Sequence, residues 1–189
     1  MLDSSRPEEL LSTALSAFES GNGYAAVLDR LPVPVYATDA DGCVTYWNQA
    51  CVDFAGREPQ LGRDRWCVSW QLYTMSGEEL PHDQCPTAKA IKERRSVRDE
   101  IAIALRPDGS RVAFRPYPTP LLGDDGTLTG AINMMIDISD EQSEALRDQA
   151  ARCRRLARST NDMRTREILR TMATGYEETA AALNQDGSE

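Results

Sequence analysis

Two Asp-Gly pairs, at 108–109 and 125–126, constrain the fold of this chain more than any other feature. Each pair lies between segments in which apolar and polar residues alternate. This combination predicts a β-hairpin, because the tight turn needs residues that tolerate a positive φ. Residues 97–121 and 123–139 are therefore predicted to hold three strands, the last of which is apolar through Asp137.

The first part of the chain repeats this pattern and then changes period. Residues 34–48 contain two short alternating runs around turn residues from Asp39 to Gly42, which predicts a further pair of strands. Residues 48–56 favour a short helix with the Asn48 side chain as its N-terminal cap. A strand pair that leads directly into a helix is thus expected near the start of the folded core.

The middle of the chain is less regular. Residues 57–85 show no clear period and are predicted to be irregular, with short helical turns. Residues 85–95 favour a helix with Pro86 in its first turn, where proline is tolerated. Because strands are predicted on both sides of these central helices, the order of elements indicates an α+β domain with an antiparallel sheet.

Both ends of the chain are predicted to be helical. Residues 5–20 carry an apolar stripe, and Ser5 is suited to cap this helix. A second helical region begins at Ser139, which with Gln142 fits a capping box, and it weakens at 159–162 before a last helix. The apolar positions that give these C-terminal helices an interaction surface are predicted to be Leu146, Cys153, Leu156, Leu169, Met172 and Tyr176.

Composition narrows the classes of function. The net charge of −9 argues against a nucleic-acid-binding face, because phosphate binding needs clustered basic residues. No apolar run approaches the roughly 20 residues that span a bilayer, and the first residues lack the pattern of a signal peptide. We therefore expect a cytoplasmic protein without a membrane partner. The five cysteines lack the spacing of a disulfide framework and are expected to be buried thiols.

Several local motifs resemble the PAS domain family over residues 28–142. The stretch LPVPVYATDADGCVTYWNQA resembles the first PAS hairpin and helix, and RPDGSRVAFRPYPTPLLGDDGTLTGAINMMIDISDEQ resembles the last three strands. Asp137, Ile138 and Ser139 are similar to the Asp-Ile-Thr signature at which many PAS cores lead into a signalling helix. The stretch WCVSWQLYTMSGEELPHDQCPTAKAI is similar to a common bacterial PAS subgroup.

This resemblance implies a PAS fold, with a five-stranded antiparallel sheet in the order 2-1-5-4-3, helices on one face and often a pocket between them. It also implies a sensor or interaction module in which the junction at Asp137, Ile138 and Ser139 passes a signal to the C-terminal helices. The expected organisation is an N-terminal amphipathic helix and linker (1–27), the PAS domain (28–142), a C-terminal helical hairpin or extension (143–184) and a disordered tail (185–189).

The single histidine of the chain, His82, excludes one common activity. A histidine kinase needs a phosphoacceptor histidine on its dimerisation helix, but His82 lies inside the predicted PAS core, and no glycine-rich nucleotide-binding segment follows the helices. The light-sensing branch of the PAS family needs a cysteine in a motif that resembles Asn-Cys-Arg-Phe-Leu. Here Cys67 follows Trp66 without that motif, so the resemblance disfavours flavin photochemistry. Haem binding is disfavoured because the helix at 85–95 holds no histidine. We therefore expect no enzymatic activity.

The pair formed by His82 and Cys85 leaves several interpretations open. The two residues are candidates for a metal or haem site, and Cys85 is also a candidate nucleophile that His82 would activate. The structural interpretation is favoured. Pro81 excludes a helix before it, whereas Asp83 and Pro86 suit the start of one. In that case His82 anchors the irregular segment through a hydrogen bond.

A ligand pocket in the core would be mostly apolar with a few polar groups. Asn133 is the most informative candidate, because a polar residue in an otherwise apolar strand needs a partner if it is buried; the alternative is a surface-facing side chain. The residues that would line such a pocket, if they do not serve packing alone, are predicted to be Tyr36, Trp66, Trp70, Tyr73, Phe114, Tyr117, Asn133 and Met135.

The leading hypothesis is a non-enzymatic PAS sensory or adaptor protein that acts on a protein partner and forms a homodimer through its helices. It needs no obligatory cofactor, and a small-molecule ligand is left open. One alternative is a PAS sensor that binds haem, flavin or a small metabolite. The other is a DNA-binding regulator that uses the locally basic C-terminal helices.

Overall fold

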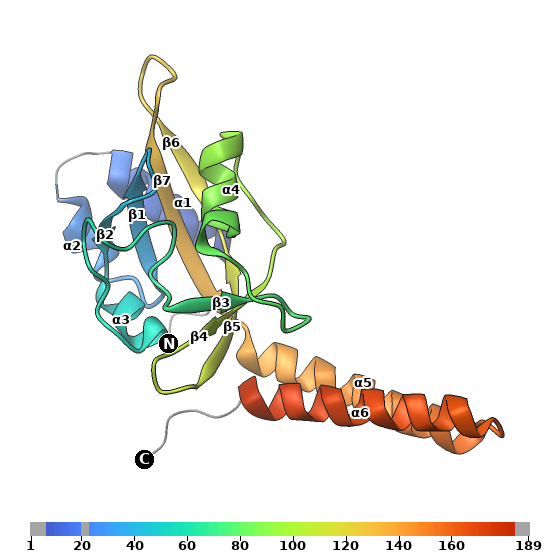
Figure 1. The fold of residues 1–189 in the computed structure, drawn as a ribbon. Coiled ribbons are helices and arrows are strands. Elements are labelled where there is room, and N and C mark those ends of the chain that lie inside the picture. The colour runs from blue at the N-terminus through green and yellow to red at the C-terminus, as the bar shows by residue number, and fades with distance from the viewer. Residues whose placement is uncertain (1–6, 20–22, 184–189) are drawn as a thin grey trace.

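The computed structural model describes residues 7–19 and 23–183, and Figure 1 shows their arrangement. The predicted cap at Ser5 and the predicted tail at 185–189 lie outside the described residues. The helices in chain order are α1 (Pro7–Glu19), α2 (Tyr24–Leu28), α3 (Gln49–Ala55), the 3-10 helix η1 (His82–Gln84), α4 (Pro86–Glu93), α5 (Ser139–Ser159) and α6 (Met163–Leu183).

Within residues 7–19 and 23–183, seven strands form one sheet in which all pairs are antiparallel. They are β1 (Val35–Asp39), β2 (Val44–Trp47), β3 (Gln71–Tyr73), β4 (Ala102–Leu105), β5 (Arg111–Pro116), β6 (Thr119–Leu122) and β7 (Leu128–Asp137). Their order is β2-β1-β7-β5-β4-β3, and β6 pairs with β7. The predicted α+β fold with an antiparallel sheet is confirmed.

The sheet has two strands more than predicted. β5 and β6 lie one after the other along β7, so together they occupy the place of one strand in the predicted order. They are separated at Tyr117, whose N–H donates to the Met134 carbonyl at 2.8 Å, and at Pro118, which has no N–H to donate. The other additional strand, β3, has only three residues, too few to show a period in the sequence.

One face of the sheet is covered by α3, the start of α4 and the irregular segment at 57–70 (Figure 1). The Phe54 ring of α3 packs edge-on against Phe114 of β5, with ring centroids 5.2 Å apart. The buried residues of this main core are Tyr36, Val44, Cys51, Phe54, Cys67, Val68, Leu72, Cys85, Ala88, Ala102, Ala104, Val112, Phe114 and Met135.

The opposite face is covered by α1 and α2, the first of which is the predicted N-terminal helix. The apolar stripe predicted for residues 5–20 is buried against the chain's own sheet, since Leu11 and Ala14 of α1 belong to a second core with Ile132 and Met134 of β7. Helices that cover both faces leave the strands buried on both sides, which explains the continuous apolar run in β7.

The two C-terminal helices form an antiparallel hairpin that projects from the sheet (Figure 1). The predicted break at 159–162 is confirmed, because α5 ends at Ser159 and α6 begins at Met163. The base of the hairpin packs on β4 and β5 through Leu146 and Leu183, in a cluster with Ile103. Within the described residues, no helix has the length and apolar composition that crossing a membrane requires.

Asn48 has a different role from the predicted one. It precedes α3, but its side chain makes no capping bond to this helix. Its Oδ1 accepts the N–H of Val35 at 2.9 Å, and its Nδ2 donates to the carbonyls of Leu28 and Val33. The buried amide therefore fastens the end of α2 to the start of β1.

Candidate functional site

A buried network of hydrogen bonds occupies the centre of the main core. The Tyr36 hydroxyl donates to the Trp66 carbonyl at 2.9 Å and lies 2.8 Å from the Thr87 hydroxyl. The Nδ2 of Asn133 donates to the same Tyr36 oxygen at 3.1 Å. The Asn133 Oδ1 accepts the Tyr117 backbone N–H at 3.0 Å. These contacts join β1, β7, α4 and the irregular segment at a single phenol.

This network settles how Asn133 satisfies its polar groups. Of the two alternatives, the buried one is confirmed, because Asn133 is 2% exposed and both ends of its amide are bonded. Burial, followed by the nearby Cys67 and Cys85, raises the pKa of Tyr36 well above its usual value. The phenol therefore stays protonated and acts as a hydrogen-bonding centre of the core.

The predicted pocket residues do not form one set. Tyr36, Phe114 and Met135 are buried together in the main core, and Trp66 packs against them while it remains partly exposed. The side chain of Tyr117 lies on the opposite face, in the core formed by α1 and α2.

Two further pocket candidates lie outside the main core. Tyr73 packs beside Ile103 and the base of the hairpin. Trp70 is 48% exposed. A ligand in the main core could therefore contact only part of the predicted set.

The segment around His82 forms a rigid corner, as the structural interpretation predicts. Pro81 precedes η1, Cys85 occupies the N-cap position of α4, and Pro86 takes the first turn of that helix. Within the described residues, no group of three or more histidine, cysteine, aspartate or glutamate side chains is placed to hold a metal ion. The metal interpretation of His82 and Cys85 therefore lacks a third ligand among these residues.

The Cys85 thiol is unsuited to act as a nucleophile. It is buried, and its Sγ contacts the Trp66 carbonyl at 3.7 Å. Burial, with a further contribution from Cys67, raises the pKa of the Cys85 thiol to about 12. Because the thiolate is the reactive form, the hypothesis that His82 activates Cys85 is not supported.

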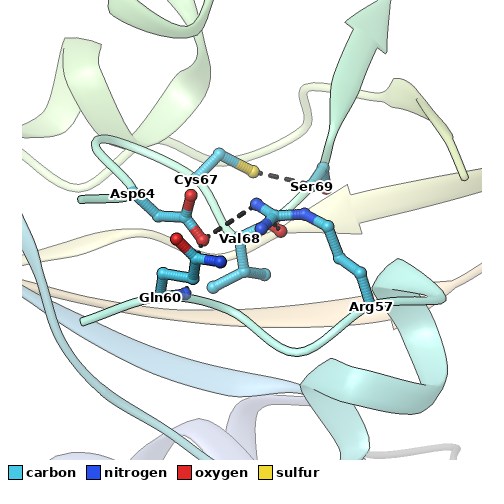
Figure 2. Close-up of polar contacts among 6 residues, drawn as sticks. All are labelled: Arg57, Gln60, Asp64, Cys67, Val68 and Ser69. Atoms are coloured by element: carbon cyan, nitrogen blue, oxygen red, sulfur yellow. Dashed lines mark hydrogen bonds and ion pairs between the residues drawn. The ribbon is translucent and has the colours of Figure 1, made fainter. Parts of the chain in front are cut away.

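A polar cleft of about 350 Å³ lies beside this corner, and its lining includes Arg57, Asp64, Trp70 and His82. Arg57 follows the end of α3, and Figure 2 shows its guanidinium reaching across to the irregular segment. There it pairs with the Asp64 carboxylate at 2.9 Å and donates to the Val68 carbonyl at 2.8 Å. Asp64 Oδ2 also accepts the Gln60 N–H at 2.8 Å.

His82 belongs to the same cleft, where burial and then the Arg57 charge lower the pKa of its imidazole. Asp64, the backbone of Ser69 and Glu79 act in the opposite direction. The interaction with the Ser69 backbone agrees with the predicted anchoring of the irregular segment. The sequence did not indicate the pairing of Arg57 with Asp64, because the segment has no period that places one side chain near another.

The junction between the sheet and the hairpin is held by Ser139. Its hydroxyl accepts the N–H of Ala113 in β5 at 3.0 Å, and its own N–H donates to Asp137 Oδ1 at 2.8 Å. The prediction that Ser139 caps its helix through a capping box was wrong, since Ile138 is the N-cap residue and the hydroxyl bonds to the sheet. Ile138 is buried beside Ala113.

The hairpin has two chemically different sides. Ala157 of α5 and Ala173 of α6 are buried between the helices. In an α-helix, successive residues are rotated by about 100° around the helix axis. Because the two helices are antiparallel, the residues that directly follow these alanines lie on one side of the hairpin, and the residues that directly precede them lie on the other side. The side of the residues that precede the alanines is the apolar side, on which Leu156 (47%), Met172 (43%) and Ile168 (52%) are exposed.

The other side of the hairpin, the arginine side, holds a groove of about 480 Å³ lined by Arg154, Arg158 and Arg170. Arg154 pairs across it with Glu177 of α6. The predicted interaction residues divide accordingly: Cys153, Leu169 and Tyr176 face the other helix, Leu146 packs at the base, and Leu156 and Met172 are exposed on the apolar side.

The chain can now be compared with known proteins. A comparison with curated proteins gives no significant match. Among solved structures, the chain is similar to the LOV protein of Rhodobacter sphaeroides, with 15% identity, a TM-score of 0.48, and 92% of this chain and 99% of that chain covered.

Two further solved structures are similar. The LOV domain of the blue-light activated histidine kinase of Erythrobacter litoralis EL346 has 20% identity, a TM-score of 0.44, and covers of 58% of this chain and 98% of that chain. The PAS domain of an HTR-like protein from Haloarcula marismortui has 17% identity and a TM-score of 0.43, and the match covers 64% of this chain and 99% of that chain. The model of the PAS fold family matches residues 28–143, more than half of the sequence, and the chain therefore belongs to this family.

Proposed function

We propose that this chain is a non-enzymatic sensory or adaptor protein that regulates a protein partner through its C-terminal hairpin. Membership of the PAS fold family supports a signal-sensing role. The observation that carries the proposal is the direct attachment of the hairpin to the sheet. Ser139 at the start of α5 bonds to Ala113, and Leu183 at the end of α6 packs in the same cluster as Ala113. A shift of β5 or β7 would therefore change the position of both helices.

In this proposal the apolar side of the hairpin packs on the same side of a second copy. Leu156, Ile168 and Met172 are exposed in a row that covers the half of the hairpin far from the sheet. Burying large apolar side chains favours association, and a twofold axis would bring the same patch of both copies together.

The charge distribution supports an antiparallel arrangement of the two hairpins. Residues 152–170 contain seven arginines and two acidic residues. The rest of the hairpin, at 139–151 and 171–183, contains six acidic residues and one arginine. When two copies pair in opposite directions about the apolar row, the arginines nearest the tip of one hairpin lie towards the acidic half of the other.

Sedimentation velocity of the full chain at micromolar concentrations tests this arrangement. The wild-type chain is expected to sediment as a dimer, and the double variant Leu156→Glu, Met172→Glu as a monomer. Leu122→Glu is the matched control, because Leu122 is 54% exposed in β6, away from the hairpin. A monomeric wild type, or a double variant that still dimerises, would contradict the proposed interface.

The arginine side favours one second candidate, binding to DNA. Arg154, Arg158 and Arg170 converge on one groove, and clustered guanidinium groups are the usual contacts to phosphate. Fluorescence anisotropy with duplex DNA at physiological salt separates the two functions. Saturable binding that Arg158→Gln and Arg170→Gln both weaken would favour DNA, and the absence of saturable binding would contradict this candidate.

The haem and flavin alternatives are tested by the visible absorption spectrum of the freshly purified full chain. If the proposed function is right, this spectrum shows no absorbance from a bound cofactor. The three partners of the Tyr36 hydroxyl support this expectation, because they use polar groups that would otherwise be free to bind a cofactor in the core.

A further inference from the structure

The cleft between the irregular segment and η1 has the size of a small ligand site. Its volume is about 350 Å³, at the lower end of the range of roughly 300–1,000 Å³ that small-molecule sites occupy. Its lining comes from residues 57–70 and His82 and includes no residue of the C-terminal hairpin. None of the contacts proposed for dimerisation involves it.

The charges of this cleft favour an anion, although the whole chain carries a net charge of −9. Arg57, Arg63 and Arg65 line it with a single carboxylate, that of Asp64, which is already paired with Arg57. Arg65 donates to the backbone carbonyl of Asp41 and forms no ion pair with another described residue. The Arg63 side chain has no hydrogen bond or ion pair to another described residue. Two guanidinium charges therefore remain available to a ligand.

Unused hydrogen-bonding capacity is concentrated at the same place. Among the described residues, three buried side-chain nitrogen or oxygen atoms lack a partner, and two of them are Arg57 Nε and His82 Nε2. Both residues line this cleft. A buried polar atom without a partner costs about 1–3 kcal/mol, so two such atoms on one cleft indicate a place where an added polar group would stabilise the protein.

Two tryptophans line the cleft. Trp70 is 48% exposed, an unusual position for so large an apolar side chain. Trp66 has a positive φ of 69°, a conformation that is costly for a bulky residue and often found at ligand sites. Its ring lies near two cations, Arg65 at 5.5 Å and Lys92 at 5.6 Å.

We propose that this cleft binds a small planar organic oxyanion. Its carboxylate or phosphate group interacts with Arg63 and Arg65, and its flat body lies against Trp70. The site is connected to the core, because the Trp66 carbonyl accepts the Tyr36 hydroxyl proton in a hydrogen bond of 2.9 Å. This inference goes beyond the proposed function and does not depend on dimerisation.

The test titrates the purified full chain with small aromatic ligands and measures their binding by isothermal titration calorimetry and by tryptophan fluorescence. Benzoate and phenyl phosphate carry the same ring with different oxyanions, so comparing them distinguishes a carboxylate from a phosphate ligand. Benzamide keeps the ring but has no charge. Saturable binding of benzoate or phenyl phosphate, with benzamide binding at least about fivefold more weakly, is the expected result.

Two arginine variants make the test specific to the cleft. Arg63→Gln is expected to weaken binding about fivefold, the effect of losing one partly exposed ion pair. The fold should tolerate it, because the Arg63 side chain has no partner among the described residues. Arg164→Gln is the matched control, since Arg164 is an exposed residue at the start of α6, and it is expected to bind like wild type.

Three outcomes would overturn the proposal. The first is the absence of saturable binding for both anions, and the second is unchanged affinity in Arg63→Gln. The third is benzamide binding as tightly as benzoate, which would make the site apolar rather than anion-selective. Sedimentation of the same samples shows whether dimerisation is affected, so a failure of this site is distinct from a failure of the proposed function.

Discussion

The side-chain amide of Asn133 connects the Tyr36 hydroxyl to the backbone of Tyr117. Its Nδ2 lies 3.1 Å from the phenol oxygen, and its Oδ1 accepts the Tyr117 N–H at 3.0 Å. Tyr117 is the residue at which β5 and β6 separate. The irregularity of the sheet edge and the polar centre of the core are thus parts of one arrangement.

Tyr36→Phe removes the hydroxyl at the centre of this arrangement. We expect a loss of about 1–3 kcal/mol in the free energy of unfolding, because Asn133 Nδ2 and the Thr87 hydroxyl lose a buried partner. Urea denaturation measures it. Tyr73→Phe is the control, since the Tyr73 hydroxyl bonds only to Gln71 at 3.3 Å and its loss should cost less. Equal stability of the two variants would contradict the role of the network.

Ser139→Ala is expected to loosen the junction between the sheet and the hairpin. The Ala113 N–H would lose its acceptor at 3.0 Å, so its hydrogen exchange should accelerate about fivefold, corresponding to the loss of roughly 1 kcal/mol. Exchange followed by NMR or mass spectrometry measures this effect. Ser139→Thr retains the hydroxyl and should restore slow exchange. An unchanged rate in Ser139→Ala would show that the hydroxyl does not hold the junction.

The stability of the chain is expected to decrease as the pH falls from about 7 to 5. Burial lowers the pKa of His82, so between its folded and unfolded pKa values the unfolded chain binds a proton that the folded chain does not. This stabilisation is complete above the unfolded value of about 6.5 and is lost below it. His82 is the only histidine, so His82→Gln should flatten the dependence of the urea midpoint on pH.

The same slope in His82→Gln and wild type would contradict this assignment. Three exposed aspartates, Asp108, Asp125 and Asp162, have lowered pKa values because nearby backbone and hydroxyl groups donate hydrogen bonds to them. Their stabilisation is present above the ordinary aspartate pKa of about 4 and is lost only at lower pH. The window from pH 5 to 7 therefore isolates the histidine.

Two glycine substitutions should have opposite effects. A Cβ at Gly130 of β7 would lie 1.9 Å from the Thr38 carbonyl oxygen, a backbone atom in the paired strand β1. Gly130→Ala is expected to cost about 1–3 kcal/mol or more, because the sheet must distort to admit the methyl group. At Gly175 in α6, a Cβ meets no atom within 4 Å, so Gly175→Ala should stabilise the chain by about 0.5–1 kcal/mol. Thermal unfolding of both variants measures the difference.

The sequence predicted the features that depend on local periodicity. The Asp-Gly turns, the helix that begins with Pro86 and the break between the last two helices all arise from residues close in sequence, and the structure has each of them. The resemblance to the PAS family supplied the order of the strands. The short strand β3 escaped prediction because three residues cannot show a period.

The roles of single side chains could not be predicted in the same way. Asn48 and Ser139 are suited by type to cap a helix, but their polar groups bond to residues 13 to 26 positions away in the chain. Tyr117 and Tyr36 both looked suited to one pocket, but they belong to cores on opposite faces of the sheet. These outcomes depend on tertiary contacts, which a single sequence does not reveal.

The length of the hairpin makes it a lever. Each helix has 21 residues and is therefore about 30 Å long. With its base held by Ile138, Leu146 and Leu183, each degree of tilt there moves the tip by about 0.5 Å. A rearrangement at β5 that is too small to disturb the core would thus displace Met163 and its neighbours by several ångströms. A displacement of this size would exchange one set of contacts between helices for another.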